Sequence, residues 1–191
     1  MLNPPHPELD DLLHMMGEAG RHFADIEASE GAARDISVCM RWPVESRSRF
    51  PVAGDIKLPQ PIPELVGETF LVSSSERRLR EIIDDPTANM ACVIVNEGRQ
   101  TGKLYASLHR RFEYVTSEFN SHLAVHYDQM LATGTIFHAI IHDQPMHLTF
   151  LSHIPHYQNE QYLNTHLMRW QPEMIVNFPD GIGFIPFCVP S

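Results

Sequence analysis

The stretch Thr116-Ser-Glu-Phe-Asn-Ser-His-Leu123, together with His142-Asp-Gln-Pro145 further along the chain, decides the fold and site predictions. The first stretch places a carboxylate, Glu118, where we expect a helix to begin. The second places an imidazole, His142, where we expect a strand to end. A carboxylate and an imidazole in such positions can serve acid–base or metal chemistry, because both side chains exchange protons and bind cations.

The element boundaries around these two stretches follow from local patterns. Thr116 or Ser117 can cap a helix running to about Leu131, because a hydroxyl accepts a hydrogen bond from an unpaired N–H group of the first turn. The apolar run from Thr135 to His142 predicts a strand. The residue spacing thus predicts one helix followed directly by one strand.

The rest of the chain alternates between helical and strand patterns. We expect helices over residues 7–28, 76–83 and from Pro145 to before Pro155. We expect strands around residues 36–40, 70–72, 92–95, 104–108, 135–142, 174–178 and 182–189. Five prolines between residues 43 and 63 predict an extended loop without regular structure. This mixture predicts a single α/β domain over residues 1–191.

Composition limits the classes of partner. Hydrophobic residues make up 43% of the 191 residues and charged residues 20%, as is usual for globular proteins. The formal net charge of −10 predicts no nucleic acid and no anionic membrane as partner, because these surfaces attract clustered Lys and Arg. An anionic substrate would therefore need a local pocket.

The N-terminal sequence and the cysteines indicate the compartment. The first residues carry prolines and acids instead of a basic region with an apolar core, so we expect no signal peptide. No run approaches the roughly 20 apolar residues that span a bilayer. The three cysteines form no CxxC pair and fit buried thiols in a reducing compartment. These observations predict a cytoplasmic protein.

Glu118, His122 and His126 are four residues apart and therefore share one face of the expected helix. One interpretation is structural: the carboxylate favours the helix start and the imidazoles pack and form hydrogen bonds. The other interpretation is a zinc site, which needs three or four ligands in fixed geometry. The residues alone leave both open. His138 and His142 likewise share one face of their strand.

Ser73-Ser-Ser-Glu76 precedes an expected helix and has two interpretations. Ser73 and Ser74, with helix N-terminal amides, can cradle a phosphate. Glu76 would repel the phosphate, and a serine-rich helix cap is the alternative.

These motifs resemble the class II aldolase/adducin family along most of the chain. The matching segments are Leu58–Pro63, Phe70–Glu76, Asp85–Asn89, Thr116–Glu118 with His122 and His126, the strand ending at His142, and Phe178–Pro186. The resemblance implies a three-layer α/β/α fold on a mostly antiparallel central sheet. It also implies a homotetramer with active sites at subunit contacts.

The resemblance further implies a zinc-dependent aldehyde-lyase that cleaves a small phosphorylated sugar, a ketose 1-phosphate, into dihydroxyacetone phosphate and an aldehyde. Glu118 would be the general acid and base, and His142 a zinc ligand. Thr116 and Ser117 would bind the substrate phosphate, with Ser73 and Ser74 in the phosphate loop. Zn²⁺ would polarise the carbonyl and stabilise the enediolate.

Several positions depart from the family pattern. Gln144 stands where the family has a second zinc-binding His, and His147 is a candidate replacement ligand. Arg34-Asp35 stands where the family has a Gly-Asn phosphate pair. Ser73-Ser-Ser-Glu76 replaces Thr-Gly-Ser-Gly and loses both glycines.

The sequence ends at Ser191, before the family's third zinc-binding His, so we expect a C-terminally shortened form of the fold. Shortening would expose apolar sheet surface, which predicts a homo-oligomer or a covering partner. Three functions follow: an aldolase with reduced or no activity, a non-catalytic aldolase-fold protein in assembly or regulation, or an altered activity at the same pocket.

Overall fold

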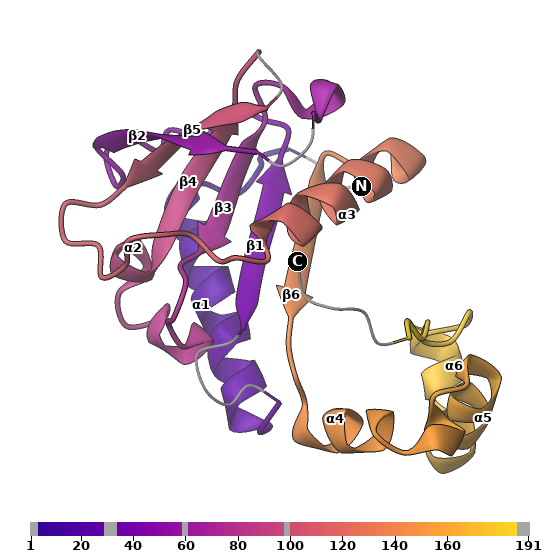
Figure 1. Ribbon diagram of the computed structural model, residues 1–191. Helices are drawn as coiled ribbons and strands as arrows, with labels where there is room; N and C mark the ends of the chain where they lie inside the picture. Colours follow the sequence, from indigo (N-terminus) through magenta and orange to yellow (C-terminus); the bar gives the residue numbers. More distant parts are fainter. Residues whose placement is uncertain (1–3, 29–33, 59–60, 98–99, 187–191) are drawn as a thin grey trace. The chain divides into compact units, whose positions relative to one another are not determined.

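The computed structural model describes residues 4–28, 34–58, 61–97 and 100–186 (Figure 1). It divides into two compact units, residues 1–144 and 145–191. Each is described by itself below. The expectation of one domain over residues 1–191 stays a prediction.

Among its described residues, the first unit contains the sheet and three α-helices. Its helices are α1 (Leu9–Asp25), α2 (Pro86–Asn89) and α3 (Phe119–Thr133). Its strands are β1 (Asp35–Met40), β2 (Val52–Lys57), β3 (Thr69–Ser73), β4 (Met90–Val95), β5 (Thr101–Ala106) and β6 (Phe137–His142). Single 3₁₀ turns lie at Pro63–Leu65 and Leu79–Glu81. The strand order is β2-β5-β4-β3-β1-β6, and every neighbouring pair is antiparallel.

Helices cover both faces of this sheet, because side chains alternate between the two faces along each strand. On one face α1 contributes Leu9, Leu12, Leu13 and Met16, which pack with Ile36, Val38, Met40 and Leu71. On the other face α3 contributes Phe119, Leu123 and Met130, which pack with Cys39, Phe70, Val72 and Val93. The two helices therefore lie on opposite sides of the strands (Figure 1). The predicted three-layer α/β/α fold with a mostly antiparallel sheet is confirmed.

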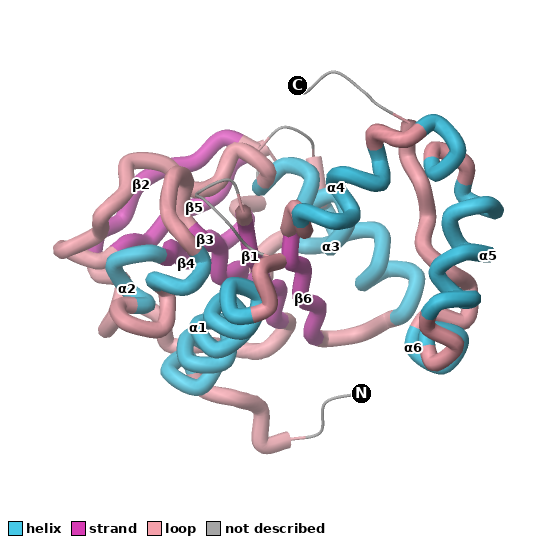
Figure 2. Tube along the Cα trace, turned by 90° about the horizontal axis from the view of Figure 1, so that it is seen from below, coloured by secondary structure: helices cyan, strands magenta, loops and turns pink. Residues whose placement is uncertain are grey.

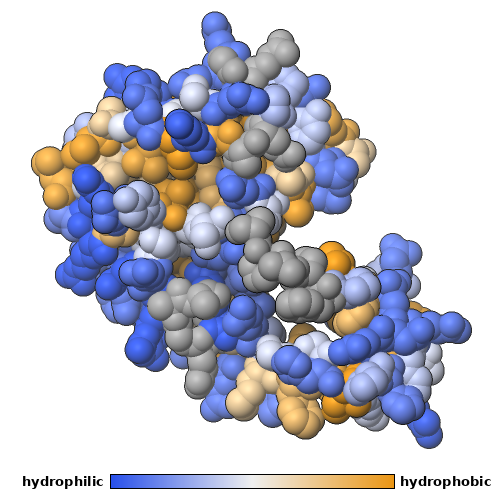
Figure 3. Space-filling view, in the orientation of Figure 1, coloured by the Kyte–Doolittle hydropathy of each residue, from blue (hydrophilic) through white to orange (hydrophobic). Residues whose placement is uncertain are grey.

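Two glycines let α1 approach the segment after β3 closely. A Cβ atom at Gly20 would lie 2.4 Å from the carbonyl oxygen of Leu79, and one at Gly17 would lie 2.7 Å from the Cα of Ile83. Both distances are shorter than any side chain tolerates. On the opposite face, Figure 3 shows apolar side chains over the strands beside α3, so this helix leaves part of its face open.

The proline-rich segment contains a strand, so the prediction of a loop over residues 43–63 is wrong for residues 52–57. β2 pairs with β5 along its whole length. In the sequence, Pro51 and Pro59 lie on either side of β2, and β2 itself contains no proline. An edge strand also needs hydrogen-bond donors on one side only, so flanking prolines do not interrupt it.

Two other helix predictions need correction. Residues 76–83 form only the 3₁₀ turn at Leu79–Glu81, because Glu76 has a φ of 57° and leaves the helical region. Helix α3 begins later than expected: Glu118 is its N-cap residue, and the Thr116 hydroxyl accepts a hydrogen bond from the Glu118 N–H group at 3.1 Å. Thr116 thus orders the turn before the helix.

The second unit consists of helices and loops among its described residues, as Figure 2 shows. It contains α4 (Met146–Ser152), a 3₁₀ turn (Pro155–Tyr157), α5 (Glu160–Trp170) and α6 (Met174–Asn177). The helix expected after Pro145 is confirmed as α4. The strand expected at residues 174–178 is wrong, because a short apolar run has the same pattern in a strand and in a helix. Residues 182–186 form no strand, and 187–189 lie outside the described residues.

Aromatic rings hold α5 to the turn before it. Tyr157 contacts Tyr162, His166 and Trp170, with ring centroids 5.4, 5.7 and 6.3 Å apart. The His166 ring stacks on Trp170 at 5.7 Å. No helix within the described residues is long and apolar enough to cross a membrane.

Candidate functional site

A cavity of about 160 Å³ lies where four segments of the first unit converge. These segments are the start of β1, the end of β6, the turn after β3 and the start of α3. The lining residues are Asp35, Ser75, Glu76, Thr116, Ser117, Glu118, His142 and Gln144. We call this cavity the strand-end pocket.

The pocket exists because β1 and β3 stop pairing at this end. Their ladder ends at Ser37 and Val72. The next N–H group of β1, that of Ile36, donates instead to the hydroxyl of Ser73 at 3.0 Å. The chain after Ser73 turns toward the start of α3, where the Thr116 N–H group donates to the Ser73 carbonyl at 3.1 Å. A serine hydroxyl thus replaces a backbone partner, and the diverging chains leave room for a ligand.

Asp35 and His142 form the charged floor of the pocket. They are opposite one another in the register of β1 and β6, and Asp35 Oδ2 lies 3.1 Å from His142 Nδ1. The hydrogen bond to Asp35 raises the pKa of His142, against the opposing effect of burial. When His142 is protonated on both nitrogens, this pair leaves its Nε2–H group as a donor.

The neighbouring residues form a second ion pair. The guanidinium of Arg34 contacts the carboxylate of Asp143, and both side chains are over nine-tenths buried. A second nitrogen of Arg34 donates to the backbone carbonyl of Gln144 at 2.8 Å. Arg34 therefore fastens the end of β6, and its guanidinium is occupied by protein groups.

Glu118 enters the pocket from the first turn of α3 and is half-buried. Its carboxylate accepts one long hydrogen bond from Ser121 at 3.4 Å. A carboxylate held this loosely keeps its remaining lone pairs for a ligand.

A chain of buried polar side chains lies between α3 and the sheet. The Ser37 hydroxyl lies 2.7 Å from His122 Nδ1 and 2.8 Å from His126 Nε2. His126 Nδ1 lies 2.9 Å from His138 Nδ1. Burial lowers the pKa of His126 to about 3, with further lowering by His138 and His122. The structure therefore gives His122 and His126 the packed, hydrogen-bonded role.

A zinc ion held by three protein ligands does not fit these residues. Asp35 holds Nδ1 of His142 and leaves Nε2 as a single imidazole ligand, and Gln144 offers only an amide. Within the described ranges, no group of three or more His, Cys, Asp or Glu side chains could hold a metal ion. The pocket brings the acid–base groups together but does not supply the three or four ligands of a zinc site.

The sequence-predicted residues separate into three sets. Thr116, Ser117, Glu118, His142 and Gln144 share the pocket. Ser73 and Ser74 lie behind it, buried, and the turn exposes Ser75 and Glu76 to the pocket in their place. His147 is an exposed residue of α4 in the second unit, so its proposed role as a replacement ligand stays a prediction.

The pairing of Asp35 with His142 and the central place of Ser37 did not follow from the sequence reasoning. A signal for Ser37 does exist. It is a polar residue inside the apolar run Ile36–Met40, on the face that receives two histidines spaced four apart.

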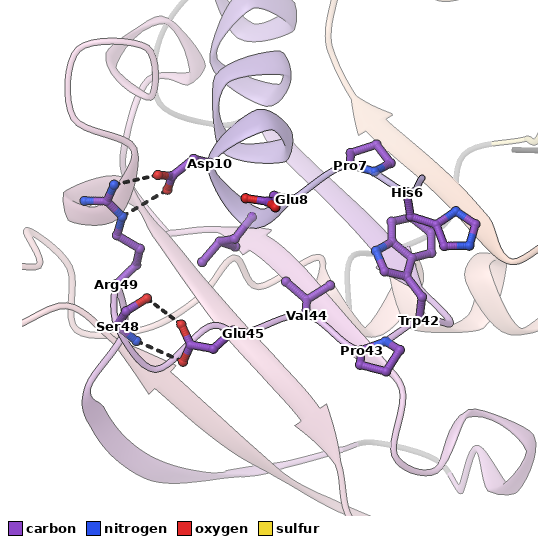
Figure 4. Close-up of a pocket in the computed structure, with 11 residues that line it drawn as sticks. His6, Pro7, Glu8, Asp10, Trp42, Pro43, Val44, Glu45, Ser48 and Arg49 are labelled. Atoms are coloured by element: carbon purple, nitrogen blue, oxygen red, sulfur yellow. Dashed lines mark hydrogen bonds and ion pairs between the residues drawn. The ribbon is translucent and has the colours of Figure 1, made fainter. Parts of the chain in front are cut away.

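A larger cavity of about 810 Å³ lies at the start of α1 and the loop after β1 (Figure 4). His6 stacks on Trp42 there, with ring centroids 4.8 Å apart. Arg49 donates two hydrogen bonds to Asp10, at 3.0 and 2.6 Å. The Arg49 guanidinium is bound by Asp10, whereas Glu118 of the strand-end pocket accepts only one long hydrogen bond, so the strand-end pocket is the better candidate site.

Comparisons with known proteins point to sugar-phosphate aldolases. No family model matches the chain. Rhamnulose-1-phosphate aldolases of Yersinia pestis (strain Pestoides F) and Yersinia pseudotuberculosis (serotype O:1b) are each 30% identical over 136 residues, covering 71% of this chain and 49% of theirs. The chain thus spans about half the length of these curated relatives. The crystal structure of a sugar-phosphate aldolase from Thermotoga maritima matches with a TM-score of 0.75 and 21% identity, over 95% of this chain and 72% of that chain.

Proposed function

Because the chain is class II aldolase-like in sequence and fold, we propose that its strand-end pocket binds a small hydroxyketone and exchanges a proton on it through Glu118. One observation carries the proposal. Glu118, His142, Thr116 and Ser117 line the same cavity, although they come from two distant parts of the chain.

Each group has a chemical task in this proposal. The Glu118 carboxylate takes a proton from the carbon beside the ketone, and the ketone oxygen gains negative charge. The Nε2–H group of His142 donates a hydrogen bond to that oxygen, since the neighbouring Asp35 favours the charged imidazole. The hydroxyls of Thr116 and Ser117 bind the ligand hydroxyls. No metal takes part in these steps.

The charges of the pocket favour a neutral ligand over a phosphate. Three carboxylates, those of Asp35, Glu76 and Glu118, line it together with one imidazole. Arg34 is paired with Asp143 and supplies no free cation. We therefore propose little or no cleavage of rhamnulose 1-phosphate, and dihydroxyacetone as a better probe than its phosphate.

Deuterium exchange tests the proposal. NMR should show that the protein speeds the exchange of dihydroxyacetone carbon-bound protons in D₂O, and that Glu118→Gln abolishes the effect. Asp128→Asn, which removes a carboxylate on the same helix outside the pocket, is the matched control. Exchange that EDTA abolishes and Zn²⁺ restores would overturn the metal-free proposal.

A second candidate is a non-catalytic role in assembly or regulation. It is favoured by the two ion pairs, Asp35 with His142 and Arg34 with Asp143, which satisfy the charges without any ligand. This candidate predicts no change in the NMR signals of pocket residues with millimolar dihydroxyacetone. Light scattering would test the associated expectation of a homotetramer.

A further inference from the structure

Four side chains from three elements form one continuous hydrogen-bonded chain in the first unit. They are His122 and His126 of α3, Ser37 of β1 and His138 of β6, and we call them the histidine–serine chain. His122, Ser37 and His126 are almost completely buried, at 3%, 0% and 0% exposure. His138 is half-buried on the edge strand β6. The chain thus runs from the interior to the edge of the sheet.

The inner end of the chain lies beside the strand-end pocket. His122 is one helical turn after Glu118, and its N–H group donates to the Glu118 carbonyl at 3.0 Å. Ser37, which binds Nδ1 of His122, is the next residue after Asp35 on the same face of β1. The charges of Asp35, His142 and Glu118 all act on the His122 ring.

Among the residues that the structure describes, the remaining nitrogen of His122 has no hydrogen-bond partner. Nε2 is buried and makes no hydrogen bond. A buried polar atom without a partner is costly, so such atoms usually bind a ligand or water. Here the atom lies at the pocket end of the chain, and both ring nitrogens of His126 and Nδ1 of His138 are hydrogen-bonded.

Counting protons gives this chain two arrangements. A neutral imidazole has one N–H group and one acceptor nitrogen, and a serine hydroxyl carries one hydrogen. If Ser37 donates to His126 Nε2, then His122 is protonated on Nδ1, His126 on Nδ1 and His138 on Nε2. If Ser37 donates to His122 Nδ1, all three rings hold the opposite tautomer.

We propose that the histidine–serine chain carries a proton between the strand-end pocket and the edge of the sheet at His138. The inference rests on the proposed function, because Glu118 supplies the proton it has taken from the ligand. That proton binds His122 Nε2, and the Nδ1 proton of His122 passes to Ser37.

The transfer continues with one proton moving at each link. Ser37 passes its hydrogen to His126 Nε2, His126 passes its Nδ1 proton to His138 Nδ1, and His138 releases its Nε2 proton. One proton enters, one leaves, and all three tautomers are inverted. The inverted chain is then set to carry a proton back to the pocket. His126 strongly disfavours a positive charge, so the links move together instead of storing a charge at the centre.

The tautomers of the wild-type protein provide the first test. NMR of protein labelled with ¹⁵N-histidine distinguishes N–H from bare nitrogen in each ring. We expect His122 and His126 to share one tautomer and His138 to hold the other. Two rings that both donate to Ser37 would overturn the proposal, because a hydroxyl accepting from both sides passes no proton.

Substitution of the central link provides the second test. Ser37→Ala should uncouple the tautomer of His122 from that of His126, and Ser37→Thr should restore the coupling. Ser107→Ala is the matched control, since Ser107 is also buried and lies 2.9 Å from a histidine, His109, away from the pocket.

The dihydroxyacetone exchange assay separates this proposal from the proposed function. Ser37→Ala should slow exchange about tenfold or more while the Kd for dihydroxyacetone is unchanged. Unchanged exchange in Ser37→Ala would refute the proton path and leave the pocket proposal standing. If the wild-type protein shows no exchange, the pocket proposal fails. The histidine tautomers measured by NMR then decide alone whether the three rings are coupled through Ser37.

Discussion

Replacing His126 with glutamine should make the protein less sensitive to mild acid. The folded protein holds the pKa of His126 at about 3, whereas an unfolded chain has a histidine pKa of about 6.5. As the pH falls below 6.5, His126 binds a proton in the unfolded state but not in the folded state. Stability is therefore lost as the pH falls from 6.5 toward 3.

The size of the effect follows from the two pKa values. At pH 5 the unfolded state gains about 2 kcal/mol from protonation of this one residue, compared with about 0.2 kcal/mol at pH 7. His126 is fully buried, so solvent screening reduces this figure little. Glutamine keeps one donor and one acceptor for Ser37 but does not titrate.

Urea unfolding at pH 7, 6 and 5 measures the effect. His126→Gln will have a lower free energy of unfolding than the wild type at pH 7. This difference in unfolding free energy should narrow by about 2 kcal/mol at pH 5. Met130→Ala is the control, because it removes a buried, non-titrating side chain of the same helix and should cost the same at each pH. If the unfolding free energies of the wild type and His126→Gln differ by the same amount at all three pH values, the reasoning is refuted.

Three further predictions concern other parts of the first unit. Gly20→Ala should lower the free energy of unfolding by about 1–3 kcal/mol, because its Cβ would clash with the Leu79 carbonyl, whereas the exposed change Glu18→Ala should cost little in the same urea assay. Glu76→Gly should tighten binding of dihydroxyacetone phosphate several-fold in an NMR titration, because it removes a carboxylate from the pocket; equal or weaker binding would contradict this. Gln144→His should raise the zinc content per chain above that of the wild type in elemental analysis, since it adds an imidazole beside the pocket; an unchanged content would contradict this.

Local patterns predicted the elements that supply apolar residues to the core. The helix α1 and the strands β1, β3, β4 and β6 follow from apolar periodicity, because each supplies a stripe to a core cluster. Apolar periodicity could not predict β2, because β2 is a largely exposed edge strand held by its pairing with β5. Tertiary pairing, which no local pattern contains, determines that strand.

The pocket residues were predicted better than their partners. The helix start and the strand end located Glu118 and His142, and the family resemblance brought them together. The bond between Asp35 and His142 depends on the register of β1 and β6, which joins residues far apart in the chain. The φ of 57° at Glu76 is a backbone conformation that favours glycine, at a position where the family resemblance implies one.

The buried pairing of Arg34 with Asp143 constrains how this pocket can evolve. Losing one partner of a buried ion pair leaves an isolated charge and costs about 3–5 kcal/mol, a large part of a typical protein's stability. Arg34 and Asp143 should therefore be inherited or replaced as a unit. A lineage that placed a glycine at position 34 would have to change position 143 at nearly the same time. Such a coupled step makes the loss of this ion pair rare, even where each change alone is one substitution.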